Sequence, residues 1–490
     1  MFIARFTGAL HRGGARRLAA RPIATLAIAL VAAVPLRAQH PAPAEPAAKP
    51  APSATAAPAP AFAPITLDQA IQIALQQNGT LRQAKNSASL GATAVKQQQL
   101  AFLPNLAASL STSQNYSTGG LAAVTATGLP ESNALNQSSQ SVSAGVSSSV
   151  TLFNGLKNVD QLRSAKLLQQ AGTQDVTRAQ QTVIYTVAAN YINLADQQEQ
   201  LRVQQQNLAS QQAQEKEIQA GVNAGTHPIS DLYQQQALVA GAQASVVDAQ
   251  NAVALAKVTL MQTLQLDPRG SYEFATPPVD TTTSADTSLD LDSLLTRALS
   301  QRADIAAQQS RAGAAKQDVS AASASWWPTI SLTAGYSTAY NSAAVASLAD
   351  QLGQRQGATV GIGISIPIFD RGATAVATQQ AKIAADNASI VLQTQQQQVG
   401  ADVRSAYLDY QAAQQRLTAA NAQLTAATQA VNAAEQRYRV GAGTLVDLTQ
   451  ARATLVQAQS AQVSARYDLV LQRAAMSYAV GDLSAQHALG

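Results

Sequence analysis

Residues 360–368 read Val-Gly-Ile-Gly-Ile-Ser-Ile-Pro-Ile, and this stretch decides the fold. Every second residue is a branched aliphatic, and the residues between them are glycine, serine and proline. A period of two places the aliphatic side chains on one face of a β-strand. A half-buried sheet over a soluble core is the more common origin of such alternation. Here the opposite face is small and hydroxylated rather than charged, as expected of a wall between lipid and a wet lumen.

Three more segments alternate in the same way, residues 105–116, 142–152 and 330–340. Aromatic residues lie near the strand ends, where membrane barrels carry girdles at the bilayer interfaces. The candidates for this membrane-interface role are Phe153, Trp326, Trp327, Tyr336 and Phe369. Four strands cannot close a barrel, because outer-membrane barrels begin at about eight strands. We therefore expect the chain to oligomerise, with about eight strands from two copies or about twelve from three.

The chain is internally duplicated, and each copy of the repeat contains two of the four strands. The matched positions are Leu67 with Leu291, Pro104 with Pro328, Phe153 with Phe369, Tyr191 with Tyr407 and Asp231 with Asp447. A solenoid repeat is only a few dozen residues long, so this duplication is of another kind. The two halves of the chain should therefore form two similar structural units, and we expect the function to depend on the assembly of both.

Each half is predicted to run through a helix, a β-hairpin, a long helix, a turn and a shorter helix. The first repeat covers residues 65–267, with its hairpin at 105–153, its long helix at 156–220 and its last helix at 229–266. The second covers residues 290–484, with the same elements at 329–369, 372–440 and 445–480, and residues 268–289 link the two. The opening helix of the first repeat should continue to about Leu103, because Pro104 cannot extend it.

The long helix of the second repeat carries a heptad pattern of alternating large residues and alanine. Its positions are Tyr410, Ala413, Leu417, Ala420, Leu424, Ala427, Val431, Ala434 and Tyr438. This pattern predicts a closely packed coiled-coil seam along a helix of roughly 100 Å. In the first repeat Leu194, Leu201 and Leu208 keep the spacing of seven, but glutamine is more frequent between them. That seam is predicted to be looser or wetter.

The first 38 residues predict a secretory signal peptide. They hold six arginines and no acid, followed by an apolar run over residues 23–34 and a small-residue cleavage site. Without these arginines the formal net charge of +4 falls to about −2, which argues against a nucleic-acid partner. Residues 39–64 form a Pro/Ala-rich linker. The chain has no cysteine, so disulfides, cysteine-ligated metals and acylation at a lipobox are excluded.

The two helix-reversal turns hold the candidate functional residues. Asp231 and Asp447 lie just beyond them, at the far end of the long helices from the strands. In a ring of subunits these acids could form a constriction that favours cations. Thr444 and Asp447 also have the spacing of a capping box, and an acid at a helix start is stabilised by the helix dipole. Both roles stay open.

Nothing in the sequence indicates an enzyme. Of the four histidines only His227 falls in a predicted structured region, beside Pro228 in a turn. No catalytic triad, carboxylate pair, phosphate loop or zinc spacing is present in the sequence, so neither a cofactor nor a metal site is expected.

The duplicated openings at Leu67 and Leu291, the breaks at Pro104 and Pro328, and the YRVGAGTLVDL turn at 438–448 resemble the TolC-type outer membrane efflux protein family. The resemblance covers roughly residues 65–484. It implies an α+β membrane protein in which four strands per chain contribute to a twelve-stranded barrel. That barrel belongs to a homotrimer in the Gram-negative outer membrane and is continuous with a periplasmic α-helical coiled-coil barrel.

The resemblance also implies partners and a passive role. Such proteins are exit ducts of tripartite efflux systems, docked through a periplasmic adaptor to an inner-membrane pump of the RND, ABC or MFS type. Outer-membrane lipid surrounds the barrel. The same architecture serves type I protein secretion, which stays open as an alternative. A non-channel periplasmic coiled-coil protein is a further alternative, whereas an adaptor would have only one helical hairpin. The transported substrate is not written in the sequence.

The second turn departs from the family pattern of a Tyr, an Arg and two Asp. Tyr438 and Asp447 match, whereas Gly443 stands in place of the Arg and Gln450 in place of the second Asp. Asp231 matches an acid of the first turn. The resemblance therefore implies a gate held by Tyr438 hydrogen bonds and packing rather than by salt bridges.

Overall fold

The computed structural model describes residues 64–117, 137–275, 290–342, 344 and 346–484. The predicted signal peptide (1–38) and nearly all of the predicted Pro/Ala linker (39–64) lie outside these residues. The first repeat is built from α1 (Leu67–Gln77), α2 (Gly79–Leu100), β1 (Asn105–Ser117), β2 (Gln137–Asn154), α3 (Lys157–Asn223) and α4 (Ile229–Leu264). The second is built from α5 (Leu291–Gln301), α6 (Ala303–Ser323), β3 (Thr329–Asn341), α7 (Leu348–Gln354), β4 (Gln356–Ser365), α8 (Ala373–Arg439) and α9 (Leu445–Val480).

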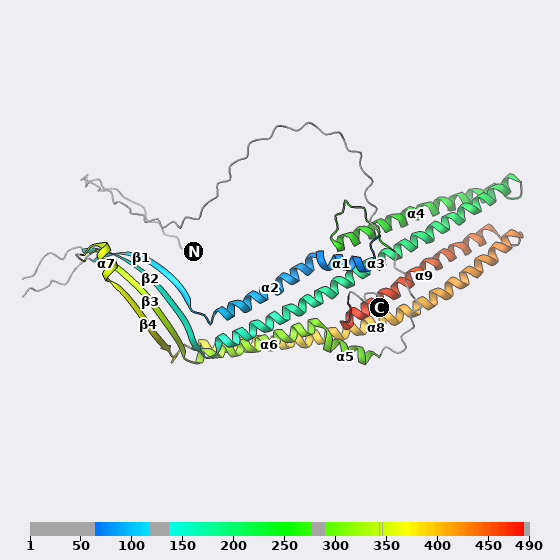
Figure 1. Cartoon of the computed structure of the whole chain (residues 1–490). Coiled ribbons are helices and arrows are strands. Elements are labelled where there is room, and N and C mark those ends of the chain that lie inside the picture. Colours follow the sequence, from blue (N-terminus) through cyan, green and yellow to red (C-terminus); the bar gives the residue numbers. More distant parts are fainter. Residues whose placement is uncertain (1–63, 118–136, 276–289, 343, 345, 485–490) are drawn as a thin grey trace, which may run out of the picture. The chain divides into compact units, whose positions relative to one another are not determined.

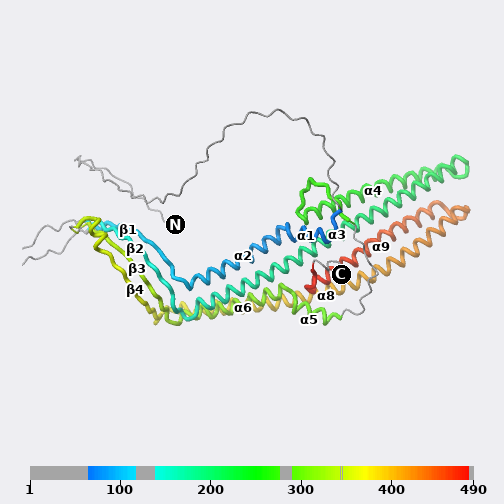
Figure 2. The backbone as a smooth tube through the Cα atoms, viewed as in Figure 1, coloured from blue at the N-terminus to red at the C-terminus, as the bar shows by residue number. Residues whose placement is uncertain are grey.

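The duplication is visible in the lengths of the helices. The long helices α3 and α8 each have 67 residues, and the return helices α4 and α9 each have 36. The opening helices α1 and α5 each have 11. Within each repeat the long helix and the return helix pack along each other, as the tube in Figure 2 shows. At 1.5 Å per residue, the strand end and the turn end of each long helix lie roughly 100 Å apart.

The four strands form one antiparallel sheet in the order β1-β2-β3-β4 (Figure 1). Its aliphatic face is exposed, with Leu106 at 79% and Val360 at 78% of their free surface. On the opposite face serines pair across β1 and β2, with 2.7 Å between the hydroxyls of Ser111 and Ser143. The predicted division into an apolar and a hydroxylated face is therefore confirmed.

Strand β4 ends at Ser365, whereas the alternation predicted a strand that continues to Ile368. Pro367 has no N–H to donate to a ladder, which explains the earlier end. The hairpin also contains α7, which sequence reasoning did not predict. Gln351 of α7 is buried and closes the loop, because its side-chain oxygen accepts from Asn341 N at 2.9 Å and its amide donates to Ala346 O at 2.7 Å.

The opening helix of the first repeat is divided, which corrects the predicted continuous helix to Leu103. The break falls at Asn78, whose side chain accepts from Leu81 N at 3.1 Å and so starts α2. Asn78 favours a helix start over a helix interior because its amide competes for the backbone. The second repeat breaks at the matching position, Arg302.

Each passage from a strand to a long helix uses two consecutive residues with positive φ. They are Gly155 (φ 67°) and Leu156 (φ 69°) in the first repeat, and Arg371 (φ 56°) and Gly372 (φ 80°) in the second. A residue other than glycine costs free energy in this left-handed region. Its occurrence at the same place in both repeats shows that the joint demands this geometry.

The predicted heptad seam of α8 is confirmed. Ala413, Ala420, Ala427 and Val431 are buried, while the leucines between the alanines are half-buried. The seam between α3 and α4 contains buried glutamines, in agreement with the glutamine-rich pattern of the sequence. There Gln211 and Gln235 are buried, and the Gln235 amide donates to the Gln211 side-chain oxygen at 2.7 Å. The Gln235 side-chain oxygen and the Gln214 side-chain nitrogen are buried without a hydrogen-bond partner among the described residues. This seam is therefore more polar than the alanine seam of α8, and its looser or wetter packing stays a prediction.

The opening helices pack on the long helices around two apolar cores. In the first repeat the core gathers around Tyr191, which is 1% exposed and whose hydroxyl donates to Ile65 O at 2.9 Å and also to Ala275 O. Burial raises the pKa of Tyr191 to about 12. In the second repeat Val399 and Val403 of α8 form the smaller core with α5, α6 and α9. None of the helices in the described part of the chain has the length and apolarity needed to cross a membrane.

Candidate functional site

The second turn is held by a capping box. After α8 ends, Gly441 takes a left-handed backbone (φ 73°), and Thr444 then caps α9. The Thr444 hydroxyl accepts from Asp447 N at 3.1 Å, and the Asp447 carboxylate accepts from Thr444 N at 3.1 Å. The Thr444 hydroxyl also donates to the Asp447 carboxylate at 2.8 Å. This bond and the one from Thr444 N hold the pKa of Asp447 below its usual range, with a smaller contribution from the charge of Arg437. The capping role predicted for Asp447 is therefore present, and its side chain stays exposed at the turn.

The first turn is built differently, without a side-chain cap on α4. Pro228 precedes the helix, and Asp231 lies half-exposed in its first turn. The turn closes through Thr226, whose backbone N–H and hydroxyl both donate to Gly221 O, at 2.9 and 3.0 Å. His227 packs against Gly221 so closely that a Cβ at residue 221 would lie 2.0 Å from the ring. A larger residue at 221 would therefore displace the His227 ring from this position.

The two turns meet at an apolar cluster of Ile218, Leu232 and Leu445. Tyr438 packs on this cluster, and its ring stacks on that of His227 with 5.9 Å between the centroids. The resemblance implied hydrogen bonding by Tyr438, but its enclosed hydroxyl has no partner among the described residues. Burial and the negative charges of Asp231 and Glu217 raise its pKa. Packing rather than hydrogen bonding thus joins the turns in this chain.

Neither Gly443 nor Gln450 belongs to this cluster. At Gly443 a Cβ would lie 3.2 Å from Arg437 Cβ, so a larger residue requires a small shift of the end of α8. The Gln450 side chain is exposed. Sequence reasoning missed the cations of this region, Arg437 and Arg439, although two basic residues in the last turn of a helix are a common sign of favourable charge–dipole contact.

The five predicted interface aromatics do not share one surface. Trp326 lines a hollow together with Ile368 and Phe369, which are 95% and 84% exposed. Trp327 instead lines a different hollow, together with Thr329 and Ser365 of the hydroxylated face. Tyr336 is half-exposed on the aliphatic face, and its hydroxyl donates to Gln356 Oε1 at 2.5 Å.

Phe153 owes its place to a bulge. Simple alternation from Leu152 would put Phe153 on the hydroxylated face. A register shift between Thr151 and Phe153 sets Phe153 opposite Ile330 instead, and residues directly opposite share a face. The bulge therefore brings Phe153 to the aliphatic face, where the predicted membrane-interface role needs it.

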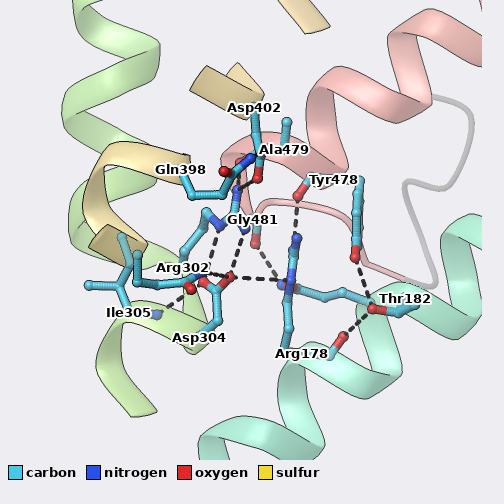
Figure 3. A network of polar contacts seen from close by, with 12 residues as sticks. Arg178, Thr182, Arg302, Asp304, Ile305, Gln398, Asp402, Tyr478, Ala479 and Gly481 are labelled. Carbon is cyan, nitrogen blue, oxygen red and sulfur yellow. Dashed lines mark hydrogen bonds and ion pairs between the residues drawn. The ribbon is translucent and has the colours of Figure 1, made fainter. Parts of the chain in front are cut away.

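A charged network at the end of α9 was not predicted from the sequence (Figure 3). Arg302 is 3% exposed and makes a bidentate pair with Asp304, with contacts of 3.1 and 2.7 Å. Its guanidinium also reaches Asp402 of α8 at 3.2 Å and donates to Ala479 O of α9 at 3.1 Å. One side chain thus joins α6, α8 and α9.

Arg178 of α3 binds the same helix end from the first repeat (Figure 3). It donates to Tyr478 O at 3.0 Å, lies 3.9 Å from the centroid of the Tyr478 ring and approaches Asp304 at 3.8 Å. Two cations at the carbonyl end of a helix are favoured by its dipole. The network therefore fastens the two repeats of one chain together.

The pKa values of the network follow from burial and charge. Burial lowers the pKa of Arg178, and the neighbouring charge of Arg302 lowers it further. Burial alone would raise the pKa of Asp304, but the bonds from Arg302 and the charges of both arginines bring it below its usual range. Sequence reasoning missed Arg302 because a helix-breaking position gives no sign of a partner on α9, 177 residues away.

An antiparallel sheet with an exposed aliphatic face, joined to two long helical hairpins, defines a class of protein: the outer-membrane channel subunit that extends into the periplasm. Comparison with known proteins agrees. The family model described as "Outer membrane efflux protein" matches residues 70–264 and 294–482, once in each repeat. The chain belongs to this outer membrane efflux protein family.

Individual proteins show the same relation. The chain is 26% identical to the outer membrane efflux protein BepC of Brucella suis, over 70% of this chain and 72% of BepC. It is 25% identical to TolC of Escherichia coli, over 86% of this chain and 83% of TolC. The solved outer-membrane channel OprN superposes with a TM-score of 0.72 at 23% identity, over 85% of this chain and 90% of OprN.

The chain is therefore an efflux channel of the Gram-negative outer membrane, with a periplasmic helical part. The family is one of transporters without enzymatic activity. Its channels are trimers that act with efflux systems.

Proposed function

We propose that this chain forms a homotrimer whose three sheets close a twelve-stranded barrel. The observation that carries the proposal is the sheet itself. Strands β1 and β4 each pair on one side only among the described residues. An unpaired strand edge is unstable in lipid, and four strands are too few to close. Pairing of β4 of one copy with β1 of the next removes every edge.

The proposal is tested by the behaviour of the purified protein. We expect it in the outer-membrane fraction, as a trimer in detergent whose migration in gel electrophoresis changes on heating. Recovery as a soluble monomer from the periplasm would contradict the barrel.

In this proposal the helical end meets a periplasmic adaptor, and the channel serves an inner-membrane pump of the RND, ABC or MFS type. Support comes from the length of α3 and α8, which carries the turns roughly 100 Å from the strands. Single cysteines at Thr226 or Ala442, in a chain that has none of its own, should cross-link to an adaptor in cells. Cross-links only between copies of this chain would argue against docking at the turns.

The turns form the inner gate of this channel. His227 and Tyr438 hold the two hairpins of one chain together, and Asp231 and Asp447 add an acidic lining around the axis. An acidic ring favours cations. Replacement of Asp447 by alanine should therefore reduce blockade by multivalent cations in planar bilayers. An unchanged blockade, with a less stable α9, would leave Asp447 only its capping role.

A further inference from the structure

Trp326 and Trp327 are adjacent in the sequence, but the structure places them beside different surfaces. Trp327 has an extended backbone (φ −90°, ψ 153°) and lies two residues before Thr329, the first residue of β3. Side chains two residues apart on an extended chain point to the same face. Trp327 is therefore in phase with Thr329 and Ser331 of the hydroxylated face, whereas Trp326 lies beside Ile368 and Phe369.

The strand register supports this assignment independently. Thr329 lies opposite Ser365 in β4, and Ser331 lies opposite Thr151 in β2. Opposed residues share a face, so Thr151, Thr329 and Ser365 lie on one side of the sheet. All three line the same hollow as Trp327, with a volume of about 320 Å³. The aliphatic face is the one that lipid would cover, so this hollow opens to the lumen of the proposed barrel.

One basic side chain lines the hollow. Lys157, the first residue of α3, lines it together with Asn154, and no carboxylate of the described residues lies within ion-pairing distance of its ammonium group. The Trp327 side chain is 61% exposed, so its indole is accessible. The hollow thus offers an aromatic plane, an unpaired ammonium group and several hydroxyls. A ligand that has both an aromatic ring and an anionic group could contact all three.

Gly155 fixes Trp327 at this place. A Cβ at residue 155 would lie 2.8 Å from Trp327 Cβ and 2.5 Å from Ala324 O. Gly155 also has a positive φ of 67°. The strand-to-helix joint of the first repeat is thus packed against the Trp327 side chain and the Ala324 backbone. The matching joint of the second repeat has Arg371 instead of glycine.

We propose that Trp327 and Lys157 form a binding site for aromatic carboxylates on the luminal face of the barrel, where strands pass into helices. The aromatic ring stacks on the indole and the carboxylate pairs with the ammonium group. This site rests on the proposed trimeric barrel, which would carry three copies around the lumen. It would give the duct a contact with anionic aromatic cargo where its helices pass into its strands.

The first experiment tests which of the two tryptophan side chains is exposed to the lumen. The chain has no cysteine, so Trp326→Cys and Trp327→Cys each introduce a single reactive thiol. In planar bilayers a charged, membrane-impermeant methanethiosulfonate reagent should modify Trp327→Cys and lower its conductance, and leave Trp326→Cys unmodified. Modification of Trp326→Cys with protection of Trp327→Cys would overturn the site.

Ligand chemistry is tested by blockade of the current with 1-naphthoate. Trp327→Leu and Lys157→Gln should each weaken blockade by about fivefold, whereas Trp326→Leu should keep the wild-type value. Cyclohexanecarboxylate, which lacks the ring, and 1-naphthylmethylammonium, which has the opposite charge, should block the wild-type channel more weakly than naphthoate. Equal blockade in all variants would refute the site while leaving the channel intact. Failure of the wild-type protein to conduct would instead contradict the barrel on which the site depends.

Discussion

In the first repeat the two opening helices meet at Asn78, and in the second they meet at Arg302. The two backbones are nearly the same, with φ −58° and ψ 123° at Asn78 and φ −62° and ψ 126° at Arg302. The side chains do different work. Asn78 caps its own helix, whereas Arg302 reaches α8 and α9. A duplicated fold thus keeps the geometry of a joint and is free to change what the joint binds.

The largest expected effect comes from breaking the charged joint. Arg302→Met leaves Asp304 and the Ala479 carbonyl without their main partner in a poorly hydrated place, at a cost of about 3 kcal/mol. Asn78→Ala in the first repeat removes only a cap, at a cost of about 1 kcal/mol. Urea unfolding in detergent, followed by circular dichroism, measures both. Equal losses would show that Arg302 acts only locally.

The two helical hairpins also differ in the residues buried between the long helix and the return helix. Gln235→Ala leaves the buried Gln211 without its partner and should destabilise the α3–α4 hairpin by about 2 kcal/mol. The double replacement Gln211→Ala with Gln235→Ala restores a pattern like the alanine seam of α8. It should therefore cost less than the sum of the two single changes. Additive losses in the same unfolding assay would show that the glutamines act separately.

The matched tyrosines give a smaller contrast. Tyr191→Phe removes a buried hydroxyl whose one proton is shared between Ile65 O and Ala275 O, and it should cost between about 1 and 2 kcal/mol. Tyr407→Phe removes only an exposed contact with Gln411 and should be close to neutral. Because burial raises the pKa of Tyr191 to about 12, its stabilising contribution is complete below about pH 10. It should decline as the pH rises from there to 12, in the wild-type protein but not in Tyr191→Phe.

The smallest effect is expected at the turns. Thr444→Ala removes the cap of α9 at a cost of about 1 kcal/mol, whereas Ser230→Ala in the uncapped first turn should change little. The pKa of Asp447 is lowered in the fold, so its contribution is present above the usual carboxyl range. It should be lost as the pH falls through the lowered value. If the stability difference between wild type and Thr444→Ala did not change as the pH falls, the hydrogen bonds to the Asp447 carboxylate would be contradicted.

Much of the fold followed from local pattern. Alternation over 360–368 and the heptads of α8 each reflect one periodic face, which sequence alone records. The Thr444 cap followed from a spacing of three. The break at Asn78, the bulge before Phe153 and the network of Arg302 did not follow. Each depends on a partner distant in sequence or on a choice between two permitted backbones.

The candidate site divides in the same way. Tyr438 and Asp447 could be found from the turn pattern, but their contacts could not. His227 stacks on Tyr438 only because Gly221 lets the imidazole approach the backbone of α3. The opposite surroundings of Trp326 and Trp327 likewise depend on a single turn of 3₁₀ helix before β3.

The central claim is that this chain is a channel whose inner end is held by packing between its two repeats. Single-channel conductance in planar bilayers tests it most directly, with wild type compared with His227→Ala, Tyr438→Ala and the control Tyr233→Ala, an exposed tyrosine on α4. We predict that both tip variants conduct more than wild type and that the control does not differ from it. Conductance that is unchanged in His227→Ala and Tyr438→Ala would contradict the claim.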